Sequence, residues 1–224
     1  MVALFVTSSG TGIGKTYLTA ALTRYFRDNG RKVEAYKPVI SGFDSAVPEE
    51  SDTGILLSAM ARPVTADEID RISPWRFTAP LSPHIAARME GRQIEFEALV
   101  EYSRSKATSA DVVLIEGVGG IMAPLDDQHT VLDWMAQIGV PALLVVGSYL
   151  GAISHTLSAL KALDVYGVEI CAVIVDESPD SSVPFDDAVA SIRQFAPRSK
   201  VVALRYQENR TATPPAIGDL VKLL

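Results

Sequence analysis

The sequence predicts an α/β fold: a doubly wound, mostly parallel sheet with helices on both faces. Short runs of β-branched and other apolar residues alternate with stretches that show helical apolar periodicity. The later apolar runs are nearly continuous, which is typical of parallel strands buried on both faces. Because no repeat, low-complexity tract or break in composition divides the chain, we expect a single domain over residues 1–224.

The apolar runs predict strands, in chain order, at residues 3–7, 32–36, 112–115, 142–146, 170–175 and 201–204. Apolar residues at helical spacing predict helices at residues 16–29, 131–138, 154–166 and 186–195, and a last helix after Pro215. Residues 38–52 and 73–83 carry prolines among polar residues, and we expect loops there.

Charge and composition exclude several function classes. The 224 residues are 48% hydrophobic and carry a net charge of −7, which argues against a general nucleic-acid binder. The single cysteine, Cys171, excludes an internal disulfide framework and a cysteine-rich metal site. No run of about 18 apolar residues is present, so we expect a cytoplasmic protein without a membrane partner. Residues 1–37 hold six Lys/Arg against two Asp/Glu, which favours an anionic ligand there.

The segment SSGTGIGKT, residues 8–16, lies between the first predicted strand and the first predicted helix. Phosphate binding needs glycines that let backbone N–H groups face the ligand, a helix N-terminus, a lysine, and a hydroxyl for Mg²⁺. Gly12, Gly14, Lys15 and Thr16 supply these parts, although Ser9 stands where the strict motif has a glycine. The alternative is a simple glycine-rich turn. The local basic excess favours phosphate, and we therefore expect a P-loop NTPase-like fold.

Three charged residues elsewhere are candidates for the same site. Glu116 ends a predicted strand and precedes glycines, so it is either a turn cap or a Mg²⁺ partner. Asp52 follows Ser51, a pair that is also common at the start of a helix. Lys37 follows the second predicted strand, and spacing alone leaves a surface charge and an anion-binding lysine equally open.

A series of short motifs runs along the chain in a fixed order. They are FVT at residues 5–7, GKT at 14–16, YKP at 36–38, SG at 41–42, SD at 51–52, SPH at 82–84, EGVGG at 116–120, PL at 124–125, DW at 133–134, VVG at 145–147 and LG at 150–151. Together they resemble the dethiobiotin synthetase family from residue 3 to about residue 176. This resemblance is far more specific than the phosphate loop, which many unrelated ATPases share. The residues after about residue 176 match the family pattern only loosely.

The resemblance implies an ATP-dependent ligase of biotin biosynthesis. Members of the family close the ureido ring of dethiobiotin from 7,8-diaminopelargonate, CO₂ and ATP, and release ADP and phosphate. One amine captures CO₂ as a carbamate, which attacks the γ-phosphate to give a carbamic–phosphoric anhydride. The second amine then closes the ring and expels phosphate. Lys15, Lys37 and Mg²⁺ would offset the charge on the groups that react.

The resemblance also implies which residues form the site. Catalysis would depend on Lys37, Lys15 and Thr11, and the Mg²⁺ on Thr16, Asp52 and Glu116. The substrate would contact Lys37, Ser41, Gly151 and Ser154, with the loop at residues 150–154 supplied by the neighbouring subunit of a homodimer. The implied nucleotide-binding residues are Gly12, Ile13, Gly14, Lys15, Thr16, Tyr17, Asp52, Glu116, Gly117, Val118, Gly119, Asp176, Arg205, Tyr206 and Glu208.

Three positions depart from the family pattern. Ser8 replaces a glycine, and Ser154 replaces an asparagine that binds substrate. Asp176 stands where the family has the asparagine that reads the adenine edge. Because an aspartate accepts hydrogen bonds and does not donate, it can take the adenine amino group but cannot serve the N7 acceptor. We therefore expect relaxed nucleobase selectivity.

Two other classes have similar phosphate loops. Glutamine-dependent amidoligases of the cobyrinic-acid type carry an added glutaminase domain, for which 224 residues leave no room. Switch ATPases of the ParA/MinD type carry a second lysine early in the loop, where this chain has Gly10. Release of phosphate that requires the diamine would separate dethiobiotin synthetase from both classes.

Overall fold

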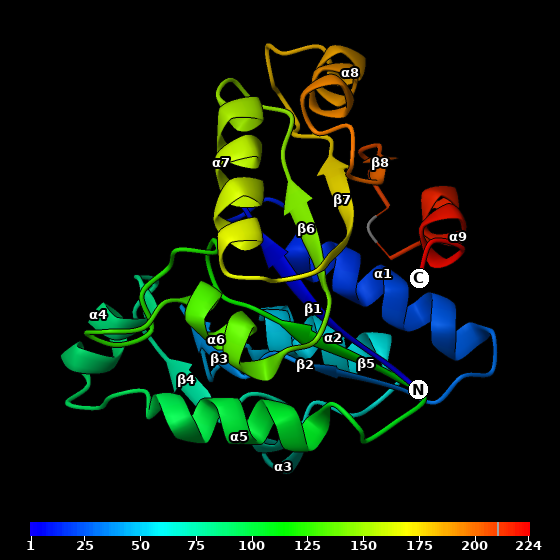
Figure 1. The fold of residues 1–224 in the computed structure, drawn as a ribbon. Coiled ribbons are helices and arrows are strands. Elements are labelled where there is room, and N and C mark those ends of the chain that lie inside the picture. Colours follow the sequence, from blue (N-terminus) through cyan, green and yellow to red (C-terminus); the bar gives the residue numbers. More distant parts are fainter. Residues whose placement is uncertain (210) are drawn as a thin grey trace.

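A computed structural model describes residues 1–209 and 211–224, and in this part of the chain a six-stranded sheet forms the centre (Figure 1). Its strands are β1 (Val2–Ser8), β2 (Val33–Tyr36), β5 (Val112–Glu116), β6 (Ala142–Val146), β7 (Ile170–Asp176) and β8 (Val201–Leu204). They lie in the order β2-β5-β1-β6-β7-β8, and each neighbouring pair is parallel. The predicted parallel sheet is confirmed.

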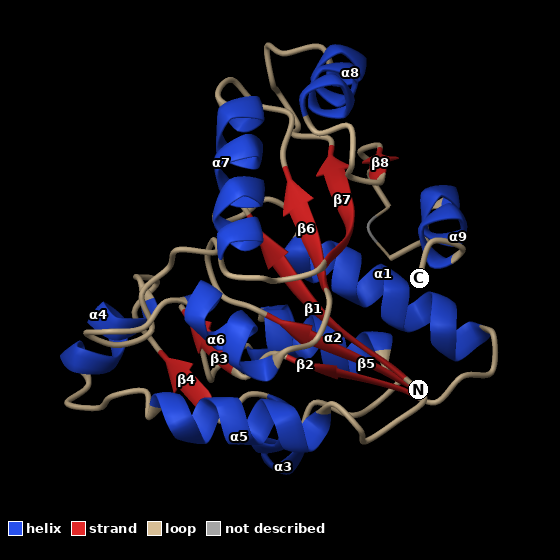
Figure 2. Ribbon diagram, viewed as in Figure 1, coloured by secondary structure: helices blue, strands red, loops and turns tan. Residues whose placement is uncertain are grey.

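Helices cover both faces of this sheet (Figure 2). They are α1 (Lys15–Asp28), α2 (Asp52–Ala59), α3 (Ala66–Ile72), α4 (Pro83–Met89), α5 (Phe96–Lys106), α6 (Val131–Ile138), α7 (Ala152–Val165), α8 (Phe185–Phe195) and α9 (Pro215–Val221). Helix α1 packs against α2 and α9 on one face, whereas α5 and α6 pack together on the other. In residues 1–209 and 211–224 no helix has the length and apolar character needed to cross a membrane.

The core lies between the sheet and its helices. Every residue of β6 is buried, as expected for a central strand covered on both faces. On the α6 side, Trp134 packs edge-on against Phe5 of β1, with the ring centroids 4.8 Å apart. Its indole N–H donates to Ser103 Oγ of α5 at 3.0 Å, so the one polar atom of this buried ring is satisfied.

The segment between β2 and β5 holds elements that the sequence analysis predicted as loops. A second, two-stranded parallel sheet joins β3 (Val39–Ser41) to β4 (Trp75–Phe77), and a short 3-10 helix, η1 (Pro48–Glu50), precedes α2. The loop prediction is therefore wrong for parts of residues 38–52 and 73–83. These elements are three residues long, too short to show a period in sequence, and each strand depends on its partner for hydrogen bonds.

Candidate active site

The loop between β1 and α1 has the conformation that its glycines predict. Gly12 and Gly14 lie in the left-handed region, with φ of 71° and 93°. A Cβ at Gly14 would lie 2.1 Å from Oδ2 of Asp176, at the end of β7. A side chain at residue 14 is therefore excluded both by the backbone angle and by the neighbouring carboxylate.

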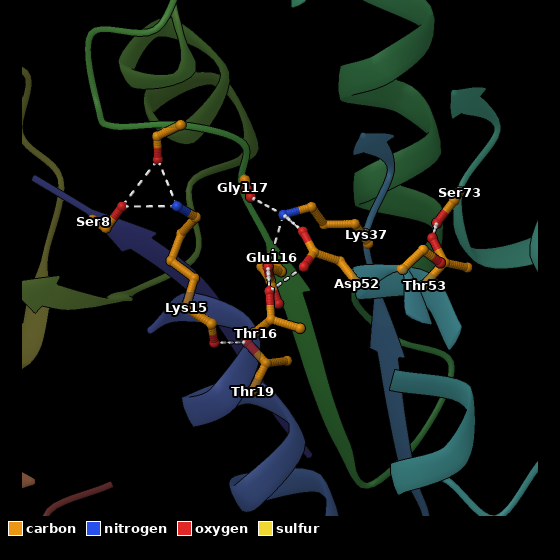
Figure 3. A network of polar contacts seen from close by, with 12 residues as sticks. Ser8, Lys15, Thr16, Thr19, Lys37, Asp52, Thr53, Ser73, Glu116 and Gly117 are labelled. Atoms are coloured by element: carbon orange, nitrogen blue, oxygen red, sulfur yellow. Dashed lines mark hydrogen bonds and ion pairs between the residues drawn. The ribbon is translucent and has the colours of Figure 1, made fainter. Parts of the chain in front are cut away.

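Lys15 begins α1 and turns its ammonium back toward the end of β1 (Figure 3). The side chain is buried, and Nζ donates to Ser8 Oγ at 3.0 Å and to the Gly119 carbonyl at 2.8 Å. A longer contact of 3.4 Å reaches the Gly10 carbonyl. All three acceptors are uncharged. Ser8, which stands in place of a family glycine, therefore adds a hydroxyl acceptor for this lysine.

Lys37, Thr16, Asp52 and Glu116 form a second cluster beside the loop (Figure 3). Lys37 Nζ lies 2.7 Å from Glu116 Oε1, 3.0 Å from Asp52 Oδ2 and 2.8 Å from the Gly117 carbonyl. Thr16 Oγ1 lies 2.8 Å from Asp52 Oδ1 and 2.7 Å from Glu116 Oε1. Only 2% of Lys37 is exposed, so it is not a surface charge.

Sheet order explains how this cluster forms. Strand β5 lies between β1 and β2, so their carboxyl ends meet at one edge. Glu116 closes β5, Lys37 follows β2, and Thr16 follows the loop that leaves β1. Asp52 is the first residue of α2, and Ser51 caps that helix by accepting a hydrogen bond from the Gly54 N–H. The cap at this serine leaves the Asp52 carboxylate available to Lys37 and Thr16.

The two lysines have opposite pKa shifts. Burial, followed by repulsion from Lys37, lowers the pKa of Lys15 from 10.5 to about 8. Burial also acts to lower the pKa of Lys37, but attraction to Glu116 and Asp52 outweighs it and raises that pKa. Burial acts to raise the pKa of Asp52, but the same attraction outweighs it and lowers that pKa. Lys37 is therefore held as an ammonium, whereas burial makes the ammonium form of Lys15 less stable than in solvent.

A cavity of about 670 Å³ opens above these clusters. Glu116 lies below its floor and is fully buried. The cavity brings together many of the predicted site residues: Thr11, Gly12, Ile13, Gly14, Lys15, Thr16, Tyr17, Lys37, Ser41, Asp52, Val118 and Gly119.

The predicted Mg²⁺ ligands fit a divalent cation. Glu116 Oε2 is buried and has no hydrogen-bond partner among residues 1–209 and 211–224. An unpaired buried carboxylate oxygen is costly, and a cation beside Thr16 and Asp52 would satisfy it. No group of three or more His, Cys, Asp and Glu side chains gathers around a metal position in the described chain. Two carboxylates and a hydroxyl instead suit Mg²⁺, which keeps several waters and takes phosphate oxygens.

Other predicted residues lie outside the cavity lining. Gly151 caps α7 with a φ of 98°, and both it and Ser154 are exposed. Arg205 pairs with Asp186 at 2.6 Å, and the Tyr206 N–H donates to Glu177 Oε2 at 2.9 Å. Glu208 is exposed in the loop after β8, and Gly117 contributes the carbonyl that Lys37 contacts. Asp176 is buried against Gly14, beneath the phosphate loop.

Part of the cavity wall was not predicted from the sequence. The lining also includes six residues that were assigned no role from sequence: Ile40, Pro80, Leu81, Ser82, Pro83 and Ala123. The SPH motif was the one available signal. This part of the wall is held in place by a contact between residues far apart in sequence. The Gly42 N–H donates to the Ala79 carbonyl at 3.1 Å.

Known proteins resemble this chain along its length. A family model described as an AAA domain matches residues 2–213. An ATP-dependent dethiobiotin synthetase BioD of Phenylobacterium zucineum is 47% identical over 195 residues, covering 86% of this chain and 83% of that protein. The BioD of Caulobacter vibrioides is 41% identical over 226 residues and covers 100% of this chain and 99% of its own. The chain belongs to the ATP-dependent dethiobiotin synthetase family. The expected family and the expected ligase function are confirmed.

Solved structures show the same fold in proteins of other function. The MinC:MinD complex of Aquifex aeolicus superposes with a TM-score of 0.63 at 14% identity, covering 100% of this chain and 96% of that one. MinD of Pyrococcus horikoshii, complexed with Mg-ADP, gives a TM-score of 0.56 at 16% identity, covering 99% and 94%. At this level of identity the likeness shows the fold alone, and the P-loop NTPase-like fold is confirmed.

Proposed function

We propose that this dethiobiotin synthetase closes the ureido ring of dethiobiotin from 7,8-diaminopelargonate, CO₂ and ATP in the 670 Å³ cavity, with residues 1–224 acting as one domain. One observation carries the proposal: the phosphate loop, Lys37 and Ser41 line a single cavity. A nucleotide on the loop thus lies beside the groups that would hold a carbamate. Phosphoryl transfer depends largely on such positioning and on charge neutralisation.

The phosphate-binding role is assigned to the loop and to Lys15. The N–H groups around Gly12 and Gly14 and the N-terminus of α1 would hold the phosphates, and Lys15 would offset the charge of the γ-phosphoryl group. Thr16, Asp52 and Glu116 would hold Mg²⁺, which supplies further positive charge there. Ile13, Tyr17, Val118 and Gly119 would complete the nucleotide side of the cavity.

The substrate side is assigned to Lys37, Ser41 and Thr11. Lys37 is held as an ammonium by Asp52 and Glu116, so it remains a positive charge for an anionic carbamate throughout the reaction. Ser41 and Thr11 line the same cavity and have hydroxyls that bind amine or carboxylate groups. The amine captures CO₂, the carbamate oxygen attacks the γ-phosphate, and the second amine displaces phosphate from the anhydride.

A homodimer would complete the site. Gly151 and Ser154 are exposed and do not line the cavity of their own chain, and 84% of neighbouring Leu150 is exposed. An exposed large apolar side chain beside an open helix N-terminus suits a loop that enters a second subunit. The N–H groups at the start of α7 would then bind the substrate carboxylate. Sedimentation of a monomer at all working concentrations would contradict this assignment.

The nucleobase would be selected weakly. Asp176 lies at the end of β7, and Arg205, Tyr206 and Glu208 follow β8, the next strand in the sheet. With an acceptor-only side chain at residue 176, we expect CTP, GTP and UTP to compete with ATP. A competition assay in which ATP is strongly preferred over all three would rule out relaxed selectivity.

One experiment tests the proposed reaction. The protein is incubated with Mg-ATP and bicarbonate, with and without 7,8-diaminopelargonate, while phosphate and product mass are followed. We expect phosphate release to require the diamine and a product with the mass of dethiobiotin to accumulate in step with it. Phosphate release that is indifferent to the diamine would contradict the proposal and favour a switch ATPase.

A further inference from the structure

The proposed reaction must dispose of protons. When an amine nitrogen bonds to CO₂, the carbamate forms and one proton leaves. When the second amine bonds to the carbamoyl carbon, the C–O bond breaks, phosphate departs with that electron pair, and the attacking nitrogen loses a proton. A group at the cavity wall that accepts a proton and passes it to solvent would assist both steps.

Neither lysine of the cavity suits this task. Lys37 donates to Glu116 Oε1, Asp52 Oδ2 and the Gly117 carbonyl, so it is fixed as an ammonium. Lys15 donates to Ser8 Oγ and the Gly119 carbonyl and would serve a phosphate as a cation. The Asp52 carboxylate also lines the cavity, but it is paired with Lys37 and accepts from Thr16. Another candidate lies in the part of the wall formed by residues 80–83.

Ser82 and His84 form a pair at that wall. Ser82 lines the cavity, and its Oγ lies 3.1 Å from His84 Nδ1. Ser82 occupies the N-cap position of α4, yet its side chain makes no cap hydrogen bond to the helix. The hydroxyl is thus committed to the imidazole. His84 is half-buried, so its ring can exchange protons with solvent.

The pair stands beside the substrate side of the cavity. The Gly42 N–H donates to the Ala79 carbonyl at 3.1 Å, and a Cβ at Gly42 would lie 3.2 Å from Pro80 Cβ. The chain leading to Ser82 therefore packs directly on the turn that follows Ser41. Both serines line the same cavity.

We propose that Ser82 and His84 form a proton relay for the amines of the substrate. This proposal rests on the proposed function. The Ser82 hydroxyl passes its own proton to Nδ1 of a neutral His84 and takes up the proton that the amine nitrogen loses. The imidazolium then releases a proton from Nε2 to solvent, and proton exchange with solvent returns the ring to the tautomer with Nδ1 free before the second step. Ser82 is the catalytic residue of the pair, and His84 acts through it.

Substitutions at both positions test the relay. His84→Asn keeps a polar group near Nδ1 but cannot accept a proton, so we expect kcat to fall about 100-fold while KM for ATP and for the diamine changes little. Ser82→Ala should lower kcat to a similar extent, whereas Ser82→Thr, which retains the hydroxyl, should stay near wild type. Added imidazole should restore a large part of the turnover of His84→Ala, since a half-buried position is open to a small base.

A matched control uses a histidine outside the cavity. His129 stacks on Phe96 with ring centroids 3.9 Å apart, and His129→Asn should leave kcat unchanged. Near-normal kcat in His84→Asn, or a loss in His84→Ala that imidazole does not restore, would overturn the relay. Failure of the proposed function has a different signature, because wild type itself would then form no dethiobiotin from the diamine.

Discussion

Lys15 and Lys37 line one cavity, and both are buried, but their surroundings differ in charge. Lys15 Nζ meets the Ser8 hydroxyl and the Gly119 and Gly10 carbonyls, which are neutral. Lys37 Nζ meets the carboxylates of Asp52 and Glu116. Among the described residues the first ammonium has no counter-charge in direct contact, which suits it to an anionic ligand. The second is ion-paired with two carboxylates, which keep it protonated and fix its position in the cavity.

Removing the charge of Lys37 should have the largest effect. In Lys37→Gln the carbamate loses its cation, and we expect kcat to fall roughly 10³-fold, with little change in the Kd for ATP. The free energy of unfolding should also fall, by about 3 kcal/mol, because Glu116 is left buried without a counter-ion. Steady-state kinetics, calorimetry and urea unfolding measure the three quantities.

Lys32 provides the matched control for that variant, because it is exposed and lies just before β2. Lys32→Gln should be unchanged in all three measurements. If Lys37→Gln loses ATP binding as fully as turnover, Lys37 belongs to the nucleotide, and the distinction between the two lysines fails.

Lys15→Met should instead weaken nucleotide binding. One hydrogen-bonded charge on the phosphates is lost, and we expect Kd for ATP to rise roughly 10- to 100-fold. Stability should not fall, since methionine fills a similar volume without a buried charge. Isothermal titration with Lys32→Met as control measures the affinity, and an unchanged Kd would remove Lys15 from the phosphate site.

The lowered pKa of Lys15 predicts a pH dependence. ATP needs the ammonium form, so affinity should fall as pH rises above about 8, by at most tenfold per unit. Stability should behave in the opposite way. Between about 8 and 10.5 the unfolded chain holds this proton and the folded chain does not, so the Lys15 contribution to stability rises with pH. Lys37, with a raised pKa, gives no such trend below 10.5.

Binding isotherms and urea unfolding of wild type and Lys15→Met between pH 7 and pH 10 separate this contribution from that of other groups. As pH rises, the advantage of wild type over Lys15→Met in ATP affinity should shrink. The free energy of unfolding of wild type should rise relative to that of Lys15→Met. A difference that stays constant over the whole range would contradict a lowered pKa at Lys15.

Ser8→Ala should have the smallest effect. It removes one of the acceptors of Lys15 and leaves the Lys37 cluster intact, so we expect ATP to bind about threefold more weakly at constant kcat. Thr7→Val is the control, because the Thr7 hydroxyl is buried and has no hydrogen-bond partner in the described chain. A change in kcat of Ser8→Ala without a change in affinity would contradict the assignment.

The main sheet could be predicted from sequence because its strands are mostly apolar runs of four to seven residues that alternate with helices of clear apolar periodicity. The predicted strand at residues 142–146 coincides with β6, and that at 201–204 with β8. Helix α7 begins at Ala152 rather than at residue 154, because the cap is Gly151 in a left-handed conformation. Strands β3 and β4 could not be predicted, because each exists through hydrogen bonds to a partner distant in sequence.

The parts of the site that lie in one continuous motif could be predicted from the sequence. The parts that depend on the order of strands in the sheet were ambiguous. The glycines and Lys15 act through one continuous segment, so their role is readable from the loop. The role of Lys37 was ambiguous because it depends on the pairing of β2 with β5. The spacing of residues along the chain does not reveal that pairing. Ser82 was missed for a similar reason: the Gly42–Ala79 contact brings it to the cavity.

The insertion of β5 between β1 and β2 has a consequence for the growing chain. Thr16 is synthesised 100 residues before Glu116, its carboxylate partner. A nascent chain that has made only the phosphate loop therefore lacks the Glu116 carboxylate below it and the Gly119 carbonyl that receives Lys15. The complete set of contacts around the loop can therefore form only after the third strand of the main sheet, β5, has been made and has entered between the first two.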